Sequence, residues 1–240
     1  MLGSGKFFDA ENLFNEDALM QTYVGEVGKK FKPLVTDTRT YLRRALGKKK
    51  ILLEGAQGLL LSIDYGTKPY VTSSDPSMHG LAKGVGLNEW DIDLTIGIAK
   101  AYMTRVGNGP FPTEMGGKES ETHCDNHSNN KEFEKQAFAE ANVNHPNELM
   151  QGIGFRVAGG EYGATTKRPR RTGWLDLVAL KYAMQFNGSC LFLTKVDILD
   201  GCDEIKLCTH YTYEGKPYYY AGKIIQTGET LTEFPCDSTI

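Results

Sequence analysis

Near the start of the chain, apolar side chains recur every three or four residues, the spacing that lines one face of an α-helix. The positions that follow this spacing are Leu19, Tyr23, Val24, Val27 and Phe31. After them, Asp37 and Thr38 are suited to capping a second helix, which Gly47 would end. The pattern therefore predicts that residues 14–46 are helical.

Short apolar runs at residues 51–53 and 190–193 predict two buried β-strands. The second run follows a predicted helix that Thr172 would cap and that the pair Asn187-Gly188 would close. A helix that leads directly into a strand is typical of a crossover onto a parallel sheet. We therefore predict an α/β protein with a mostly parallel central sheet and flanking helices.

The stretches between these elements predict loops, one further helix and a hairpin. Residues 66–89 are rich in Gly, Ser, Pro and Thr, and we expect them to form an ordered loop. Residues 91–103 are strongly apolar and predict a buried helix, whereas residues 115–150 are polar and predict a surface excursion. Alternation over residues 205–220 indicates a hairpin that turns at Glu214-Gly215.

Composition narrows the possible classes of function. The chain has 240 residues, of which 40% are hydrophobic and 24% charged, which suits one large soluble domain. The formal net charge of −3 gives no general basic surface for nucleic acid, and no apolar run reaches the ~18 residues of a membrane span. The five cysteines form no C-x-x-C pair, so we expect free thiols and a cytoplasmic location.

The most informative chemistry follows the second apolar run, where Thr194, Lys195, Val196 and Asp197 form a T-K-x-D motif. An Asp carboxylate there can accept hydrogen bonds from the N1–H and N2–H₂ groups of guanine, whereas adenine would leave it unpaired. An unpaired buried charge costs at least ~1–3 kcal/mol, which is enough to favour GTP over ATP. Because α/β folds bind ligands at the carboxyl ends of their strands, the motif predicts a guanine-binding segment.

Lys167, Arg168, Arg170 and Arg171 form the densest positive cluster in the sequence. The planar guanidinium of arginine suits phosphate and carboxylate groups, and the N-terminus of the helix predicted to follow would also favour anions. Pro169 stiffens the segment, so we expect the arginines on either side of it to point in different directions. A solvated charged loop or a basic patch for RNA is the alternative interpretation.

Other candidates are less specific. The loop of residues 55–58 lets the backbone approach a ligand and offers the amide of Gln57, although a plain turn would look the same. No G-x-x-x-x-G-K-[ST] phosphate loop occurs in the sequence. His123, Cys124 and His127 could be taken as a metal cluster, but they lack a second ligand pair at zinc-finger spacing, and we predict no metal site in this chain.

Taken together, these motifs closely resemble the adenylosuccinate synthetase family. The stretches that carry the resemblance follow the family's order and are residues 53–58, 64–67, 69–74, 104–114, 163–176 and 193–201. The resemblance implies the P-loop-NTPase-like fold of that family, incomplete in this chain. It also implies a reaction in which GTP phosphorylates the 6-oxygen of IMP and the amine of L-aspartate then displaces that phosphate to give adenylosuccinate.

The resemblance also implies roles for individual residues. The implied IMP contacts are Gln57, Thr72, Val106 and Arg168. The implied aspartate-binding loop consists of Ala164, Thr165, Thr166, Lys167, Arg168, Pro169 and Arg170. The implied GTP-binding residues are Arg170, Lys195, Val196 and Asp197. The family uses GTP as co-substrate together with Mg²⁺, and the complete protein is expected to be a homodimer that binds neither nucleic acid nor membranes.

The chain departs from the family pattern at both ends. The glycine-rich phosphate loop is missing, and with it the family's catalytic Asp and His and its Mg²⁺ ligands. We therefore expect one incomplete domain over residues 1–240, with a helical region at 1–49, a nucleotide- and aspartate-binding core at 50–210 and a truncated part at 211–240. Such an internal fragment would not catalyse the reaction alone. The T-K-x-D motif by itself would also fit a GTP-binding regulatory module without catalysis.

Overall fold

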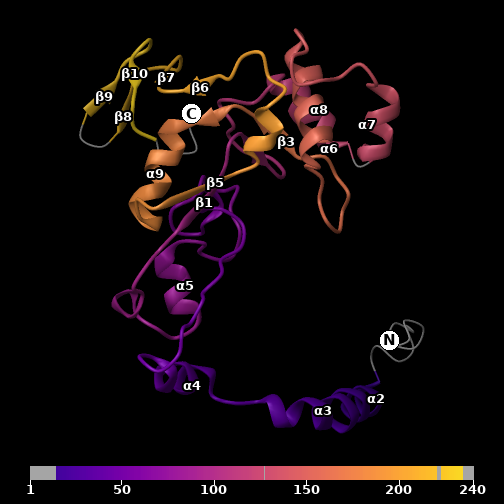
Figure 1. Ribbon diagram of the computed structural model, residues 1–240, viewed down its shortest axis with the longest axis vertical. Helices are drawn as coiled ribbons and strands as arrows, with labels where there is room; N and C mark the ends of the chain where they lie inside the picture. The colour runs from indigo at the N-terminus through magenta and orange to yellow at the C-terminus, as the bar shows by residue number, and fades with distance from the viewer. Residues whose placement is uncertain (1–14, 127, 221–222, 235–240) are drawn as a thin grey trace. The chain divides into compact units, whose positions relative to one another are not determined.

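The structure is a computed structural model that describes residues 15–126, 128–220 and 223–234 (Figure 1). Its internal contacts divide the chain into two compact units. The first comprises Met1–Leu52 and Val85–Leu87, and the second comprises Leu53–Gly84 and Asn88–Ile240. No helix in the described part of the chain is both long enough and apolar enough to cross a membrane.

The first unit contains the predicted helices. One helical stretch runs through α2 (Glu16–Leu19), a π-helical segment (Met20–Gly28), α3 (Lys29–Phe31) and a 3-10 turn (Lys32–Leu34). The next helix, α4, spans Thr38–Ala45, and the Asp37 carboxylate caps it by accepting a hydrogen bond from the backbone N–H of Thr40 at 3.1 Å. Gly47 follows with a φ of 70°, the left-handed conformation that commonly ends helices.

The predicted strand at residues 51–53 is wrong. These residues take no strand conformation, and the Leu52 side chain is 90% exposed. A strand needs a neighbour for its backbone hydrogen bonds, and none of the described strands pairs with this stretch.

The second unit begins with a loop-rich segment. A 3-10 turn (Leu59–Leu61) comes first, and α5 (Met78–Gly84) and a further 3-10 turn (Glu89–Asp91) follow. Between them, the Asp75 carboxylate accepts hydrogen bonds from the hydroxyls of Ser62 at 2.8 Å and Ser77 at 2.7 Å. The ordered loop predicted for residues 66–89 is thus confirmed up to Ser77, and α5 replaces most of the remainder.

Two of the strand pairs are parallel. β1 (Gly97–Lys100) lies beside β5 (Leu191–Thr194), with Lys100 opposite Thr194 (Figure 1). β4 (Leu175–Asp176) pairs in the same sense with β6 (Leu207–Cys208). The strand predicted before the T-K-x-D motif is therefore confirmed, but its predicted burial is wrong, because Phe192 is 62% exposed.

The helix predicted over residues 91–103 is wrong. This segment contains β1 and the start of β2 (Met103–Arg105), which pairs antiparallel with β3 (Arg171–Gly173). Ile98 in β1 is β-branched, so strand conformation suits it once β5 is available as a partner strand.

Three helices form a layer beside β3: α6 (Gly117–Asp125), α7 (Lys131–Ala137) and α8 (Glu148–Gly159) (Figure 1). α8 packs against both α6 and α7, and α6 and α8 pack against β3. The prediction of a surface excursion at residues 115–150 is therefore wrong in part. Glu134 on α7 is completely buried although its residue type favours the surface. The polar composition of this segment predicted a surface position, but some of its charged side chains are buried in a packed helical layer.

The helix predicted before β5 is α9 (Leu177–Asn187), and Gly188 ends it as expected. The predicted cap is wrong, because Asp176 caps α9 by accepting a hydrogen bond from the backbone N–H of Ala179 at 2.9 Å. Thr172 lies in β3 instead, where its buried hydroxyl donates to the carbonyl of Gly152 at 2.8 Å.

The chain continues with β7 (Tyr211–Thr212), β8 (Tyr218–Tyr220), β9 (Lys223–Ile225) and β10 (Thr230–Leu231). β7 pairs with β10 and β8 with β9, so the predicted hairpin at Glu214-Gly215 is wrong. This pairing allows Tyr211, Ile225 and Leu231 to bury their side chains in one apolar cluster with Val178 of α9.

Candidate functional site

A large pocket with a volume of about 970 Å³ lies in the second unit. One wall comes from residues 57–61, which include the 3-10 turn Leu59–Leu61. Other walls come from β1, from β2 with the turn that follows it, and from α9. Four of the predicted ligand contacts line it: Gln57, Thr72, Val106 and Arg170. The fold therefore gathers predicted IMP contacts and a predicted GTP contact around one pocket.

The charged side chains at the pocket wall are mostly positive. Lys100, Arg105 and Arg170 are the cations, and Asp176 is the one carboxylate that the described residues contribute to the lining. Asp176 is already engaged, because it accepts hydrogen bonds from the hydroxyl of Tyr211 and from the start of α9. The pocket therefore attracts anionic ligands.

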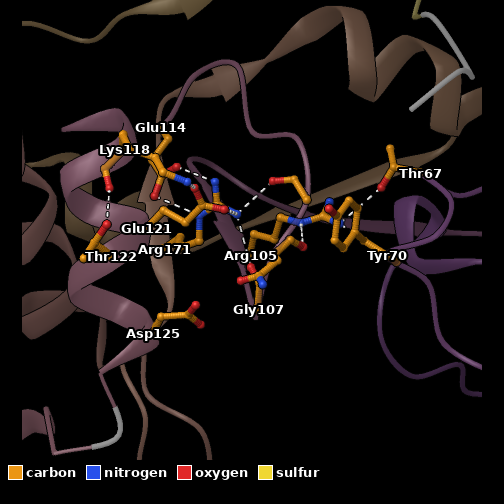
Figure 2. A network of polar contacts seen from close by, with 12 residues as sticks. Thr67, Tyr70, Arg105, Gly107, Glu114, Lys118, Glu121, Thr122, Asp125 and Arg171 are labelled. Atoms are coloured by element: carbon orange, nitrogen blue, oxygen red, sulfur yellow. Dashed lines mark hydrogen bonds and ion pairs between the residues drawn. The ribbon is translucent and has the colours of Figure 1, made fainter. Parts of the chain in front are cut away.

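Arg105, the last residue of β2, is buried beside the pocket (Figure 2). Its guanidinium donates hydrogen bonds to the Thr67 hydroxyl and the Tyr70 carbonyl, each at 3.2 Å, and to the Asn108 carbonyl at 3.0 Å. Arg105 thereby ties the loop that contains Thr67 and Tyr70 to the end of β2.

This tie brings two predicted IMP contacts together. Thr72 follows closely on the loop that Arg105 holds, and Val106 follows Arg105 directly. Burial and the nearby positive charge of Arg171 lower the pKa of Arg105 to about 10. The guanidinium stays charged at neutral pH, so the tie is retained there.

Arg171 braces the turn after β2 (Figure 2). Its Nε donates to Glu114 at 2.9 Å, and its Nη1 donates to the carbonyls of Gly107 at 3.1 Å and Gly109 at 2.8 Å. Its side chain is only 6% exposed. The interpretation of the basic cluster as one solvated or RNA-binding patch is therefore wrong for Arg171, which is part of the frame of the pocket.

The predicted aspartate-binding loop is a narrow excursion between Tyr162 and Pro169, which lie opposite each other as an antiparallel bridge. Residues 164–167 are exposed at its tip. On either side of Pro169, Arg168 forms an ion pair with Asp125 at 3.2 Å, whereas Arg170 binds Glu161 at 2.9 Å. The two arginines thus reach different partners, as the position of the proline predicted.

The predicted guanine-binding segment begins where β5 ends. Val196 and Asp197 lie in a 3-10 turn (Val196–Leu199), and Lys195 before it donates from Nζ to the carbonyl of Gly159 at 2.7 Å. These three residues are not part of the pocket lining. Burial and the Glu161 carboxylate raise the pKa of Tyr102 at the pocket wall, and the charge of Asp197 adds to this effect.

Backbone strain marks the same segments. In the described part of the chain, the non-glycine residues with left-handed φ angles are Gln57 at 63°, Lys167 at 58° and Lys195 at 61°. Such conformations are uncommon outside glycine and tend to gather at functional sites. Each of the three lies in a different predicted ligand-binding segment.

Two residues that the sequence did not single out join the site. Lys100 donates from Nζ to Glu161 at 2.8 Å and to the Thr104 hydroxyl at 2.7 Å. The same Glu161 accepts hydrogen bonds from Arg170 and from the Tyr102 hydroxyl. Lys100 would have been found from its place at the carboxyl end of a parallel strand, had this strand been predicted.

A second buried carboxylate, Glu134, supports the base of the loop. Arg156 donates from Nε to both Glu134 oxygens at 2.9 and 3.0 Å, and the Tyr162 hydroxyl and His123 Nε2 bind the same carboxylate. Arg156 also donates to the backbone carbonyl of Arg170 at 2.8 Å. Burial alone would raise the pKa of Glu134, but the hydrogen bonds from His123 and Arg156 and the Arg156 charge lower it overall.

The third member of the possible metal cluster, His127, lies outside the described residues, and His123 is engaged with Glu134. Within residues 15–126, 128–220 and 223–234, no three His, Cys, Asp or Glu side chains form a group that could hold a metal ion. The described residues therefore offer no set of ligands that fits Mg²⁺.

Comparison with known proteins identifies the family. The model of the family described as adenylosuccinate synthetase matches residues 4–234. The chain belongs to the adenylosuccinate synthetase family. It is 47% identical over 211 residues to the adenylosuccinate synthetase of Salinibacter ruber (strain DSM 13855 / M31), and 41% identical over 234 residues to that of Xylella fastidiosa (strain 9a5c). Members of this family are ligases of purine biosynthesis.

The structural comparison gives the same family. The fully ligated adenylosuccinate synthetase from Plasmodium falciparum matches with a TM-score of 0.65 and 32% sequence identity, covering 94% of this chain and 43% of that one. This likeness confirms the predicted α/β fold. The two synthetases from Salinibacter and Xylella match 87% and 95% of this chain, but only 40% and 45% of their own length is covered. The chain thus spans less than half the length of these relatives.

Proposed function

We propose that this chain forms the nucleotide- and aspartate-binding part of an adenylosuccinate synthetase, which uses GTP to join IMP and L-aspartate into adenylosuccinate, with release of GDP and phosphate. The observation that supports this most is that Gln57, Thr72, Val106 and Arg170 all line one pocket. Its positive lining suits a reaction that must hold several anions close together.

The chemistry of each side chain suits a different part of the substrates. The amide of Gln57 and the hydroxyl of Thr72 can donate and accept hydrogen bonds, which suits an oxopurine and its sugar. Arg168 can form bidentate hydrogen bonds with a carboxylate of aspartate, in place of its ion pair with Asp125. Asp197 can accept the two donors of a guanine edge.

Phosphorylation of the 6-oxygen of IMP turns a poor leaving group into a good one, and the amine of aspartate then takes its place. In this family Mg²⁺ assists the transfer from GTP, and the described residues do not supply its ligands. We therefore propose that the isolated chain binds substrates but does not turn over. The homodimer and the cytoplasmic location that the family implies are part of the same proposal.

The test compares the isolated chain with a complete synthetase that contains this segment. Each is given GTP, IMP, aspartate and Mg²⁺, and adenylosuccinate is followed by absorbance. We expect product from the complete enzyme and none from the isolated chain. Turnover by the isolated chain would mean that its residues include a catalytic centre absent from our account.

A variant then tests the pocket. In the complete synthetase, Gln57→Ala should raise KM for IMP, while KM for aspartate stays close to that of the wild type. Gln21→Ala, at an exposed position of the first unit, is the matched control and should change neither. An unchanged KM for IMP in Gln57→Ala would remove this pocket from IMP binding.

A further inference from the structure

Lys100 stands at the pocket wall but has no role among the predicted ligand contacts. It is the last residue of β1 and lies opposite Thr194, the residue before Lys195. Open α/β folds bind their ligands at the carboxyl ends of parallel strands. Lys100 therefore occupies a position at which this class of fold commonly places ligand contacts.

Glu161 holds two cations on one oxygen atom. Lys100 Nζ lies 2.8 Å and Arg170 Nη1 lies 2.9 Å from Oε2, while the Tyr102 hydroxyl donates to Oε1 at 2.8 Å. The Glu161 side chain is only 2% exposed, whereas those of Lys100 and Arg170 are 29% and 32% exposed. Two positive charges thus share one negative charge, and both Lys100 and Arg170 line the pocket.

Lys100 and Arg170 each have a hydrogen-bond donor that no described residue accepts. Arg170 Nε is buried and has no hydrogen-bond partner among the described residues. An ammonium group has three donors, and Glu161 and Thr104 account for two of those on Lys100. Burial lowers the pKa of Lys100, and the charges of Arg170 and Lys195 add to this, although Glu161 opposes them. The unused donors and the excess of positive charge suit a ligand with negatively charged oxygen atoms.

We infer that Lys100 and Arg170, held side by side by Glu161, form a subsite for a phosphate group, in which Lys100 is a direct ligand contact. This inference rests on the proposed function, because it concerns how the same pocket holds a nucleotide. The phosphate belongs either to IMP or to the guanine nucleotide, since both groups offer the same negatively charged oxygens.

Binding to the 240-residue chain tests this directly by calorimetry. The probes are inorganic pyrophosphate, IMP against inosine, and GDP against guanosine. Lys100→Met should weaken binding of a phosphate-bearing probe by about tenfold or more, because hydrogen bonds between charged groups are worth roughly 1.5–3 kcal/mol. It should leave the matching nucleoside unaffected. The pair of probes that responds identifies the source of the phosphate.

Two further variants control for charge and for folding. Lys100→Arg keeps the positive charge and should retain most of the affinity. Lys83→Met, at an exposed position of α5, should bind every probe like the wild type. Circular dichroism establishes that each variant is folded. In addition, NMR of the lysine Cε groups in the wild-type chain should show that pyrophosphate raises the pKa of Lys100 and does not move the Cε signal of Lys83.

Two results would overturn the inference: wild-type affinity for all probes in Lys100→Met, or a wild-type chain that binds no phosphate-bearing probe. Failure of the subsite is distinguishable from failure of the proposed function. If Gln57→Ala raises KM for IMP in the complete synthetase but Lys100→Met changes no affinity, only the subsite is wrong. If Lys100 governs pyrophosphate affinity but the complete protein forms no adenylosuccinate, the subsite stands and the proposed function fails.

Discussion

The helical side of the second unit buries Glu134 and Arg156 completely, whereas the strand pair β1–β5 leaves Ile98 70% exposed and Phe192 62% exposed. The buried charges find their partners within the described residues, through hydrogen bonds that also hold both ends of the loop before Arg170. In the strand pair, by contrast, the apolar side chains of Ile98 and Phe192 remain mostly exposed to solvent.

This difference has consequences for stability and for binding. In the helical region, loss of one partner leaves a charge buried and uncompensated, which is expensive. In the strand pair, removal of a half-exposed apolar side chain loses little burial. We therefore expect the residues around Arg168 and Arg170 to be firmly positioned in this chain, and the segment of Asp197, which follows the exposed strand, to be held less firmly.

The largest expected effect is on the buried carboxylate. Glu134→Gln should lower the free energy of unfolding by about 3–5 kcal/mol, because Arg156 would be left buried without its counter-charge. The lowered pKa of Glu134 means that its contribution is present at neutral pH and is lost as the pH falls through the folded-state pKa, below the usual value of 4.5. Urea unfolding at pH 7 and pH 3 measures both effects. Glu132→Gln, exposed on the same helix, is the control, and an equal loss in both variants would contradict the account.

The next prediction separates the two arginines beside Pro169. In the complete synthetase, Arg168→Lys should reduce kcat/KM for aspartate by a factor equivalent to about 2–4 kcal/mol, since lysine cannot reproduce a two-pronged carboxylate contact. Arg170→Lys should leave aspartate nearly unaffected and raise KM for GTP. Kinetics with each substrate varied in turn decide the matter, with Arg44→Lys on α4 as the control. Equal defects for GTP and aspartate in both variants would mean that the loop acts as one diffuse basic patch.

A smaller effect is expected at the base-reading position. Asp197→Asn should shift the preference between GTP and XTP by about 1–3 kcal/mol toward XTP, because Asn can donate to the 2-oxo group of XTP whereas Asp can only accept. KM for aspartate should change far less than KM for the nucleotide. The ratio of kcat/KM for GTP and XTP in the complete synthetase is the measurement, and an unchanged ratio would remove Asp197 from guanine recognition.

The smallest effect is expected on the exposed strand. Phe192→Ala should cost the isolated chain less than about 1 kcal/mol of stability, because most of its side chain is already in contact with solvent. Thermal unfolding of the isolated chain measures this loss. A loss as large as that of Glu134→Gln would show that β5 is covered in solution, and the contrast between the two regions would then be wrong.

The sequence was a better guide to some of the residues that line the pocket than to the frame that holds them, although Arg168, Lys195 and Asp197 are not in the lining. Gln57, Thr72, Val106 and Arg170 come from stretches that resemble the family, and the structure places all four at one pocket. The turn at Lys195 was also found, because an apolar run ending in T-K-x-D predicts a strand end. These signals are local in sequence, so they can be recognised without knowledge of the fold.

The frame could not be predicted because it depends on pairing across the chain. Glu134 looks like a surface residue until His123, Arg156 and Tyr162 are known to surround it. The run over residues 91–103 is mostly apolar, and only the pairing of its parts with β5 and β3 decides where it forms strands. Lys100 was missed for this reason, since its place at a strand end was hidden by the predicted helix.

The central claim is that the pocket bounded by Gln57, Thr72 and Val106 binds IMP. Its most direct test is an NMR titration of the isotopically labelled 240-residue chain with IMP. We predict that the amide signals of these three residues shift together and saturate with one dissociation constant. Shifts confined to the exposed loop tip at residues 164–167, or no shifts at any concentration, would contradict the claim.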